Sequence, residues 1–301
     1  MKHIIILNGH AGEGTAQSHL SELQEAFKNL DAEIHCTTAP GEAITFLRER
    51  LANETAPVRV YACGGDGTLH ECLNGVVGHD NVELALNAIG TGNDFAKVYG
   101  GISVFSDINK VIEGTVENID ISKITSPDLE NPIYCINAIN AGFDAMVGKL
   151  GNDYKLQGKK DPYDKAIFPC LLKHMKHPIK VTVNGEVISG KNILLANFCH
   201  GKYIGGKFYT APRSDNKDGL LEVCQAKSIN IFQFLGILGP FTKGEHLNGK
   251  HDKIFTYRRG TEVNLSSPKT IHLCVDGEMY QGKEFNITVL KQSLKFIVPK
   301  E

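Results

Sequence analysis

The chain has 301 residues, 42% of them hydrophobic and 22% charged, with a formal net charge of −2 and no tryptophan. This length predicts one large domain or two medium ones, and the near-neutral charge argues against a nucleic-acid partner held by bulk positive charge. No apolar stretch approaches the roughly 20 residues that a membrane-spanning helix needs, and the N-terminal apolar run is too short for a signal peptide. The eight cysteines form no C-x-x-C pair, which predicts buried free thiols in a reducing compartment.

The first part of the chain alternates strand patterns with helix patterns. Residues 4–7 form a continuous apolar run, typical of a strand buried on both faces. Further strands are predicted over 33–38, 58–62 and 82–88, and apolar residues at helical spacing follow each of the first three strands. This alternation predicts an open α/β nucleotide-binding domain over residues 1–127, with ligands at the carboxyl ends of its strands.

Beyond residue 127 the pattern changes to short strands separated by turns. Residues 179–189 alternate with period two across an Asn-Gly turn, a strong hairpin signal. We therefore predict a β-sandwich substrate domain over residues 128–290, with one helical insertion at 161–176. A last strand at 294–298 can close either domain, and residues 291–301 are therefore a candidate for a C-terminal strand that returns to the first domain. The other predicted strands are 132–139, 192–198, 219–226, 253–258, 261–265, 270–275 and 284–290.

Two glycine-rich loops follow strands of the first domain. The first, Gly64-Gly65-Asp66-Gly67-Thr68, lies between a strand and an amphipathic helix, which is the context of a phosphate-binding loop. Glycine lets the backbone approach phosphate oxygens, and a helix N-terminus supplies N–H groups and a favourable dipole. The second, residues 90–94, repeats the arrangement after the next strand, and residues 8–14 form a third glycine-rich turn. Such loops converge on one crevice; a tight turn with an N-cap is the alternative for each.

The first loop contains no lysine, unlike the best-known phosphate loop. Backbone amides and magnesium must then offset the phosphate charge. Asp66 is therefore a candidate partner for nucleotide-bound magnesium or for an acceptor hydroxyl, with a simple turn-forming role as the alternative.

Together with residues 140–144, 215–221 and 276–278, these loops resemble the motifs of the diacylglycerol kinase catalytic family, in the same order. That family includes sphingosine kinases, ceramide kinases and soluble bacterial lipid kinases. The resemblance implies an α/β domain, a β-sandwich domain and an active site with ATP in the cleft between them. It also implies an ATP- and Mg²⁺-dependent kinase that phosphorylates the free hydroxyl of a lipid such as diacylglycerol.

Carried over position by position, the resemblance gives a set of nucleotide contacts in the first domain. These are Asn8, Thr38, Gly64, Gly65, Asp66, Gly67, Thr68, Leu69, His70, Thr91, Asn93 and Asp94. In the second domain the family's proton acceptor comes from the Asp276-Gly277-Glu278 motif, so that Asp276, Glu278 and Asp66 are the candidate catalytic residues. Either Asp276 or Glu278 can be the base, although the residues alone favour a β-turn with solvated acids.

Residues 215–220 resemble a loop that binds a structural magnesium ion in soluble bacterial relatives. There, the side chain that matches Asp218 and the backbone carbonyls that match Asp215 and Leu220 provide oxygen ligands, which hard cations prefer. An Asp-Gly turn without a metal explains these residues equally well.

A basic segment, residues 149–180, carries eight lysines against three aspartates. It can dock on an anionic membrane surface or form an ordinary solvated helix face. We therefore expect a cytoplasmic protein, or one peripheral to the inner face of a membrane. The pattern identifies neither the lipid nor the oligomeric state.

Two other functions share some of these motifs. NAD kinases and 6-phosphofructokinases contain the Gly-Gly-Asp-Gly-Thr loop, but the all-β second half argues against a phosphofructokinase, and no Asn-Glu pair follows a second strand as an NAD kinase would need. A catalytically inactive nucleotide or lipid sensor is the third hypothesis. The presence of Asp66, Asp94, Asp276 and Glu278 argues against it.

Overall fold

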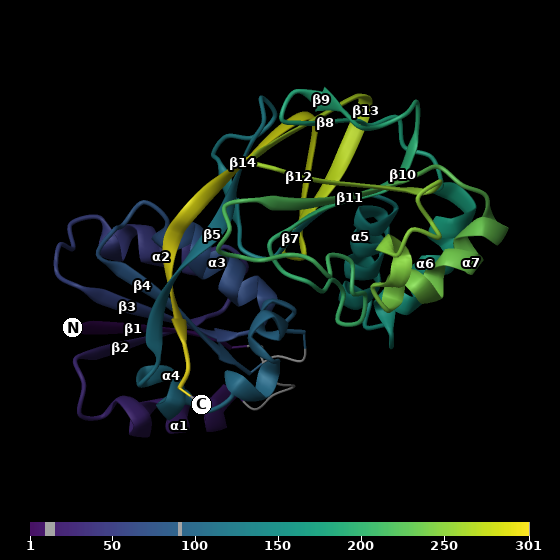
Figure 1. The fold of residues 1–301 in the computed structure, drawn as a ribbon. Helices are drawn as coiled ribbons and strands as arrows, with labels where there is room; N and C mark the ends of the chain where they lie inside the picture. Colours follow the sequence, from purple (N-terminus) through teal and green to yellow (C-terminus); the bar gives the residue numbers. More distant parts are fainter. Residues whose placement is uncertain (10–15, 90–91, 301) are drawn as a thin grey trace. The chain divides into compact units, whose positions relative to one another are not determined.

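The computed structural model describes residues 1–9, 16–89 and 92–300 and divides into two compact units (Figure 1). Unit 1 comprises residues 1–121 and 291–301, and unit 2 comprises residues 122–290. The chain passes from one unit to the other twice, once within strand β5 (Thr115–Thr125) and once within strand β14 (Glu278–Val298). No helix in the described part of the chain is both long and apolar enough to cross a membrane.

Unit 1 contains a parallel sheet in the order β14-β4-β3-β1-β2. Its strands are β1 (Lys2–Asn8), β2 (Ala32–Thr37), β3 (Val58–Gly64), β4 (Val82–Ala88) and the end of β14. The helices are α1 (Ala16–Phe27), α2 (Glu42–Leu51), α3 (Asp66–Val76) and α4 (Ile108–Ile112), with short 3₁₀ helices at Phe95–Tyr99 and Ile102–Val104. The predicted α/β class is confirmed. Strands β1 and β3 are as buried as their unbroken apolar runs indicate, whereas β2, at the edge of the sheet, is only partly buried.

The end of β14 completes this sheet from the far end of the chain. Phe296 pairs with Leu84 of β4 and is fully buried. Its ring lies 5.2 Å from that of Phe95, 5.9 Å from that of Tyr99 and 6.0 Å from that of Phe105, measured between centroids. The last strand therefore belongs to the core of unit 1.

Unit 2 is built on antiparallel strands in the order β12-β11-β10-β7-β13-β14, with the β8–β9 hairpin beside β13 and β6 beside β5. The strands are β6 (Ile133–Cys135), β7 (Ala138–Gly142), β8 (Lys180–Val183), β9 (Glu186–Val187), β10 (Ile193–Cys199), β11 (Leu221–Lys227), β12 (Phe255–Gly260) and β13 (Glu262–Val275). The helices are α5 (Phe143–Leu156), α6 (Pro162–Lys173) and α7 (Ile231–Thr242), with a 3₁₀ turn at Glu245–Leu247. The predicted β-sandwich-like class is confirmed.

Alternation along the strands sends neighbouring side chains into two separate cores. In β11, Leu221 and Val223 belong to a core to which no helix contributes. Cys224 and Ala226 belong to a second core, which α5, α6 and α7 cover. All eight cysteines of the chain are free thiols and all but Cys36 are buried, as predicted.

Several elements differ from the sequence-based expectation. The segments predicted as separate strands at 261–265 and 270–275 form one strand, β13, with a register shift between Ser266 and Ile271. Likewise, 284–290 and 294–298 are parts of the single strand β14, in which Gln292 has a positive φ of 48°. Strand β5 and helices α4, α5 and α7 were not predicted. The Asn184-Gly185 hairpin is confirmed, with φ of 46° and 85° at its turn.

Candidate functional site

The first glycine loop joins the end of β3 to the start of α3. Thr68, in the first turn of α3, accepts a hydrogen bond at Oγ1 from Asn8 Nδ2 at 3.2 Å, so the end of β1 meets the loop. A Cβ on Gly64 would lie 2.2 Å from Thr68 Oγ1, so only glycine leaves room for the hydroxyl. Gly65 is the extended N-cap of α3 and offers no side chain to the first N–H groups of the helix. This is the arrangement by which helix N-termini bind phosphate.

The second glycine loop is tied to the first by Asp66. Both carboxylate oxygens of Asp66 accept the backbone N–H of Asp94, at 2.9 and 3.1 Å. Asp94 also forms an ion pair with Lys97, at 2.7 Å between Oδ1 and Nζ. Because β3 and β4 are neighbouring parallel strands, their two loops meet at the same edge of the sheet, as predicted. Lys97, which sequence reasoning missed, brings a positive charge beside a loop that has none.

Other parts of the first motif support the loop from behind. Glu71 on α3 accepts the N–H groups of Gly41 and Ala43, at 2.8 and 3.2 Å, and so caps the start of α2. A Cβ on Gly75 would lie 2.8 Å from the Leu47 side chain, so this glycine allows α2 and α3 to pack closely. These motif residues therefore have a structural explanation that needs no ligand contact.

The remaining predicted nucleotide contacts differ in their surroundings. Thr38 follows β2, and its N–H and hydroxyl both donate to Glu42, at 2.7 and 3.0 Å; these bonds lower the pKa of Glu42 to about 2. The side chains of Leu69, His70 and Asn93 are buried, and the N–H of Leu69 already donates within the helix to Gly65, at 3.1 Å. Thr91 lies outside the described residues, as do residues 10–14 of the third glycine-rich turn.

In unit 2, Asp276 and Gly277 form the tight turn between β13 and β14. Their φ angles are 49° and 98°, and Val275 pairs with Glu278 across the turn. Both central residues have positive φ, as in a type I′ hairpin, for which Asp-Gly is a favoured sequence.

The carboxylate of Asp276 is buried in a set of hydrogen-bond donors. The backbone N–H groups of Ile136, Asn137 and Ala138 each donate to it at 3.0 Å, and the thiol of Cys135 donates at 3.1 Å. The Asp276 N–H in turn donates to the carbonyl of Ala138 at 2.9 Å. Asp276 therefore fixes the turn to the 135–138 segment.

Glu278, two residues later, has the opposite environment. Its side chain is exposed, and it makes no hydrogen bond or ion pair with the residues that the structure describes. The glutamate is the first residue of β14, so a rigid turn holds its backbone while its carboxylate can reach a ligand. A carboxylate in this state can accept a proton; one that already accepts four hydrogen bonds is a poorer candidate.

One titratable group of unit 2 was not identified as a site residue from the sequence. Asp144, in the first turn of α5, accepts a hydrogen bond from Asn197 Nδ2 at 3.1 Å, and Asn197 Oδ1 accepts one from Asn140 at 3.0 Å. Burial raises the pKa of Asp144 to about 6, although the Asn197 hydrogen bond opposes the shift. Shifted carboxyl groups of this kind are common at functional sites. The available signal was the 140–144 motif, which ends in this aspartate.

The predicted structural metal loop contains an internal cation instead. Asp218 Oδ1 accepts the N–H of Leu220 at 2.9 Å, and its other oxygen forms an ion pair with Arg259. Arg259 Nε also lies 2.7 Å from Oε1 of the buried Glu222. Asp215 Oδ1 accepts the N–H of Lys217 at 3.0 Å, an ordinary turn. With Arg259 in this position the Asp218 carboxylate does not fit a magnesium ion, and the assignment of a metal here stays a prediction.

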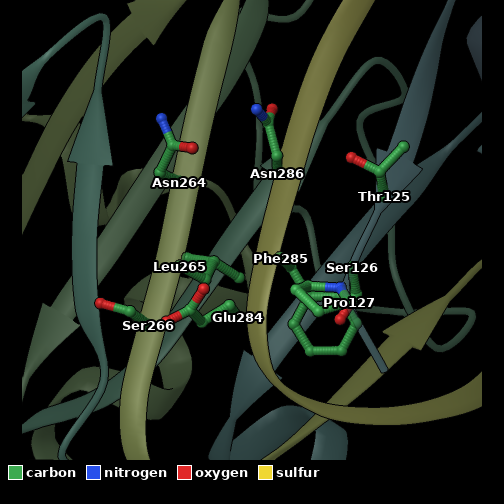
Figure 2. A pocket seen from close by; sticks show the side chains of 9 residues that line it. All are labelled: Thr125, Ser126, Pro127, Asn264, Leu265, Ser266, Glu284, Phe285 and Asn286. Atoms are coloured by element: carbon green, nitrogen blue, oxygen red, sulfur yellow. The ribbon is translucent and has the colours of Figure 1, made fainter. Parts of the chain in front are cut away.

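Neither of two surface hollows coincides with the predicted site. The larger, about 420 Å³, lies in unit 2 beside β13 and β14. Figure 2 shows the paired residues Asn264 and Asn286 on these strands, with Thr125 of β5 beyond Asn286. The smaller, about 230 Å³, lies at the end of α2 in unit 1. Within the described residues, no three His, Cys, Asp or Glu side chains gather closely enough to hold a metal ion.

Family models match both parts of this chain. The model described as "Diacylglycerol kinase catalytic domain" matches residues 2–124, which contain both glycine loops. The model described as "YegS C-terminal NAD kinase beta sandwich-like domain" matches residues 137–298, which contain the Asp276 turn and the Asp218 loop.

Relatives resemble the chain over almost its full length. A "Diacylglycerol kinase" of Bacillus subtilis (strain 168) is 28% identical over 317 residues, which cover 99% of this chain and 96% of the relative. A "Probable lipid kinase YegS-like" of Shewanella frigidimarina (strain NCIMB 400) is 27% identical and covers 99% and 94%. A crystal structure of a diacylglycerol kinase from Bacillus anthracis str. Sterne has the same fold, with a TM-score of 0.71 at 22% identity over 99% of this chain and 97% of that one. The chain belongs to the diacylglycerol kinase catalytic-domain family and carries the YegS-type C-terminal domain of the bacterial lipid kinases.

Proposed function

We propose that the protein transfers the γ-phosphoryl group of ATP to a free hydroxyl of a lipid such as diacylglycerol. The observation that carries this proposal is the contrast at the β13–β14 turn. Asp276 is fixed by four donors, while the Glu278 carboxylate is exposed. An acceptor hydroxyl has to lose its proton as it attacks phosphorus, and Glu278 is the group of the motif that can take it.

The nucleotide is assigned to the glycine loops of unit 1. The N-terminus of α3 would bind phosphate through Gly65, Gly67 and Thr68, with Asn8 holding the Thr68 hydroxyl in place. Asp66 keeps the second loop in register through the Asp94 N–H. Leu69 and His70, whose side chains are buried, would shape the loop from behind.

Magnesium would neutralise the phosphate charge when it binds with ATP. Asp66 and Asp94 supply hard oxygen donors at the edge of the sheet where the loops meet, which is the type of donor that magnesium requires. Lys97, already paired with Asp94, adds a further positive charge near the phosphates.

The acceptor is assigned to unit 2 through Glu278. The identity of the lipid follows from the relatives only as a class, because their descriptions name diacylglycerol kinases and a lipid kinase. A lipid acceptor is presented by a membrane, so we also propose peripheral contact with an anionic surface through exposed lysines of the basic segment, among them Lys159, Lys160 and Lys173.

A transfer assay with labelled ATP tests the proposal. Diacylglycerol, phosphatidylglycerol, a sphingoid base and a prenol are compared with NAD and a sugar phosphate as acceptors, followed by extraction into organic solvent. We expect label in the organic phase with at least one lipid, and a strong loss with Glu278→Gln. Label confined to a water-soluble product from NAD or the sugar phosphate would overturn the lipid assignment in favour of a kinase of a soluble acceptor. Absence of transfer to every acceptor would favour an inactive sensor.

A further inference from the structure

Helix α7 exposes large apolar side chains over an outer face without charge. No residue from Ile231 to Thr242 is ionisable, and Phe232 and Leu235 are 81% and 58% exposed. Gly236 and Gly239, on the same outer side, have no heavy atom near their would-be Cβ positions. A surface helix of a soluble protein ordinarily presents charged residues to water, so this face departs from the rule.

The helix is stable enough to present this face as a fixed surface. Asn230 and Gln233 form a reciprocal capping box at its start, which satisfies N–H groups at its N-terminus. Its inner residues Phe234, Ile237 and Phe241 are buried. The exposed side chains are therefore the outer half of a well-packed helix.

Helix α6 exposes a second apolar pair. Phe168 and Leu172, four residues apart and so on one face of the helix, are each 65% exposed. The inner residues Cys170 and Leu171 pack into the same core cluster as Phe234, Ile237 and Phe241 of α7. Residues of β10, β11 and β12 belong to this cluster as well, so both helices lie on one side of these strands (Figure 1).

The charges around these apolar side chains are mostly positive. Lys165, Lys173 and Lys176 on and after α6 and Lys227 and Lys243 beside α7 are exposed. The single acidic residue of α6, Asp164, is already paired with Lys207, at 2.5 Å. An apolar centre with a lysine rim is complementary to a bilayer that contains anionic lipids.

We propose that the outer faces of α6 and α7 form a bilayer-docking surface, into which Phe232, Leu235, Phe168 and Leu172 contribute the inserted side chains. A second copy of the chain is a poorer occupant, because a two-fold contact would bring the lysine rims together. The proposal rests on the membrane contact of the proposed function and deepens it, although docking itself needs neither ATP nor an acceptor. It makes apolar insertion, rather than lysine charge alone, the source of binding.

The absence of tryptophan from the chain allows a direct test by fluorescence. Phe232→Trp places a single reporter on α7, and Val187→Trp places one at another exposed apolar position, in the β8–β9 hairpin. Vesicles of phosphatidylcholine with phosphatidylglycerol should shift the emission of the position-232 reporter to the blue and allow quenching by brominated lipid. The reporter at position 187 should show neither effect. No shift at position 232 would overturn the proposal.

Vesicle sedimentation without ATP gives an independent measurement. Phe232→Ser with Leu235→Ser should weaken binding at least about tenfold, because each side chain loses an apolar burial, whereas Val187→Ser should bind like wild type. Lys165→Glu with Lys173→Glu should weaken binding mainly at low salt, with Lys269→Glu as the matched control. Equal binding by the serine pair and wild type would overturn insertion. A blue shift that needs no vesicles and grows with protein concentration would instead identify the face as a contact between copies.

Kinase measurements separate this proposal from the proposed function. The serine pair should lose activity on a diacylglycerol presented in vesicles but keep it on a short-chain diacylglycerol dispersed in water. If no lipid is phosphorylated at all, the fluorescence and sedimentation results still decide whether α6 and α7 dock on a bilayer.

Discussion

Gly64 and Thr68 compete for the same space at the start of α3, since a Cβ on Gly64 would lie 2.2 Å from Thr68 Oγ1. The hydroxyl can accept the Asn8 hydrogen bond only because position 64 has no side chain. The first glycine, Gly64, therefore sets the shape of the loop. Gly67 has a different proposed role, which is to leave space for phosphate.

Gly67→Ala should weaken ATP binding at least about tenfold without loss of stability. Gly67 is the second residue of α3, so alanine suits the helix, but its methyl group enters the space proposed for phosphate. Calorimetric titration with ATP measures the effect. Gly64→Ala should lower both the ATP affinity and the melting temperature. Gly190→Ala is the control, because its added Cβ meets no heavy atom within 4 Å, and it should change neither the ATP affinity nor the melting temperature. Unaltered ATP affinity in Gly67→Ala would refute the phosphate loop.

Asp276→Asn and Glu278→Gln should fail in different ways. Glu278→Gln should lower kcat by about 10²–10⁴-fold and leave the melting temperature unchanged, because the side chain is exposed. Asp276→Asn should lower the melting temperature, because its amide would present N–H to the surrounding N–H donors. Steady-state kinetics and thermal unfolding are measured on both. Cys135→Ser, which retains a donor to Asp276, is the control. Near-normal turnover by Glu278→Gln would show that the base lies elsewhere.

The wild-type melting temperature should be the same in magnesium and in EDTA, because Arg259 already neutralises Asp218. Arg259→Gln should destabilise the protein by on the order of 1–3 kcal/mol. It leaves the buried Glu222 carboxylate without a cation, but the Tyr257 hydroxyl still donates to that carboxylate, and Arg259 itself is partly exposed. Magnesium should then recover part of that loss. Arg258→Gln breaks an exposed pair with Glu186, at 3.5 Å, and an exposed hydrogen bond to the Tyr257 carbonyl, at 2.9 Å, and should change little. A wild-type protein that loses stability in EDTA would show that the Asp218 loop holds a metal ion after all.

Asp144→Asn should change how stability depends on pH. Burial raises the pKa of Asp144 from 3.8 to about 6, so the folded protein binds more protons than the unfolded chain between these values. Wild-type stability from this group therefore falls as pH rises from about 4 to about 6, then levels off. The variant lacks this loss, so its stability relative to wild type should rise across the window, by on the order of 2–3 kcal/mol at most. Asp153→Asn, on the exposed side of α5, is the control.

The pH measurement has an opposing contribution that both proteins share. Burial lowers the pKa of His200 to about 4, so the stability it provides is present above about pH 6.5 and is lost as pH falls toward 4. The difference between Asp144→Asn and wild type cancels this effect. A pH-independent difference would contradict the raised pKa of Asp144.

Several elements could be predicted from the sequence because their own residues carry a strong local signal. The strand at Ile4–Leu7 is apolar throughout, and the Asn184-Gly185 turn has the residues that positive φ demands. Helix α7 gave no such signal: it is apolar all round and contains Gly236, Gly239 and Pro240, so no period of 3.6 stands out. The two sides of the helix differ in burial and not in residue type, since one side packs against a core and the other is exposed.

The sequence predicted the residues of the candidate site better than it predicted their roles, because those roles depend on long-range partners. Sequence reasoning placed Asp276 and Glu278 in one turn but left either of them as the base. What distinguishes them is a set of N–H groups from Ile136 to Ala138, about 140 residues earlier in the chain. Arg259 beside Asp218 is another long-range partner. Such contacts join residues that lie far apart in the sequence, so no local sequence pattern predicts them.

The place of Phe296 in the core of unit 1 has a consequence for protein synthesis. Residues 1–121 leave the ribosome long before Phe296 is made, yet β4 lacks this neighbour and the Phe95 ring lacks its partner until then. N-terminal domains ordinarily fold first during translation, whereas here we expect the first unit to be completed last. Ribosome-bound chains that end near residue 200 should therefore be cleaved by protease within residues 1–121, and full-length chains should resist.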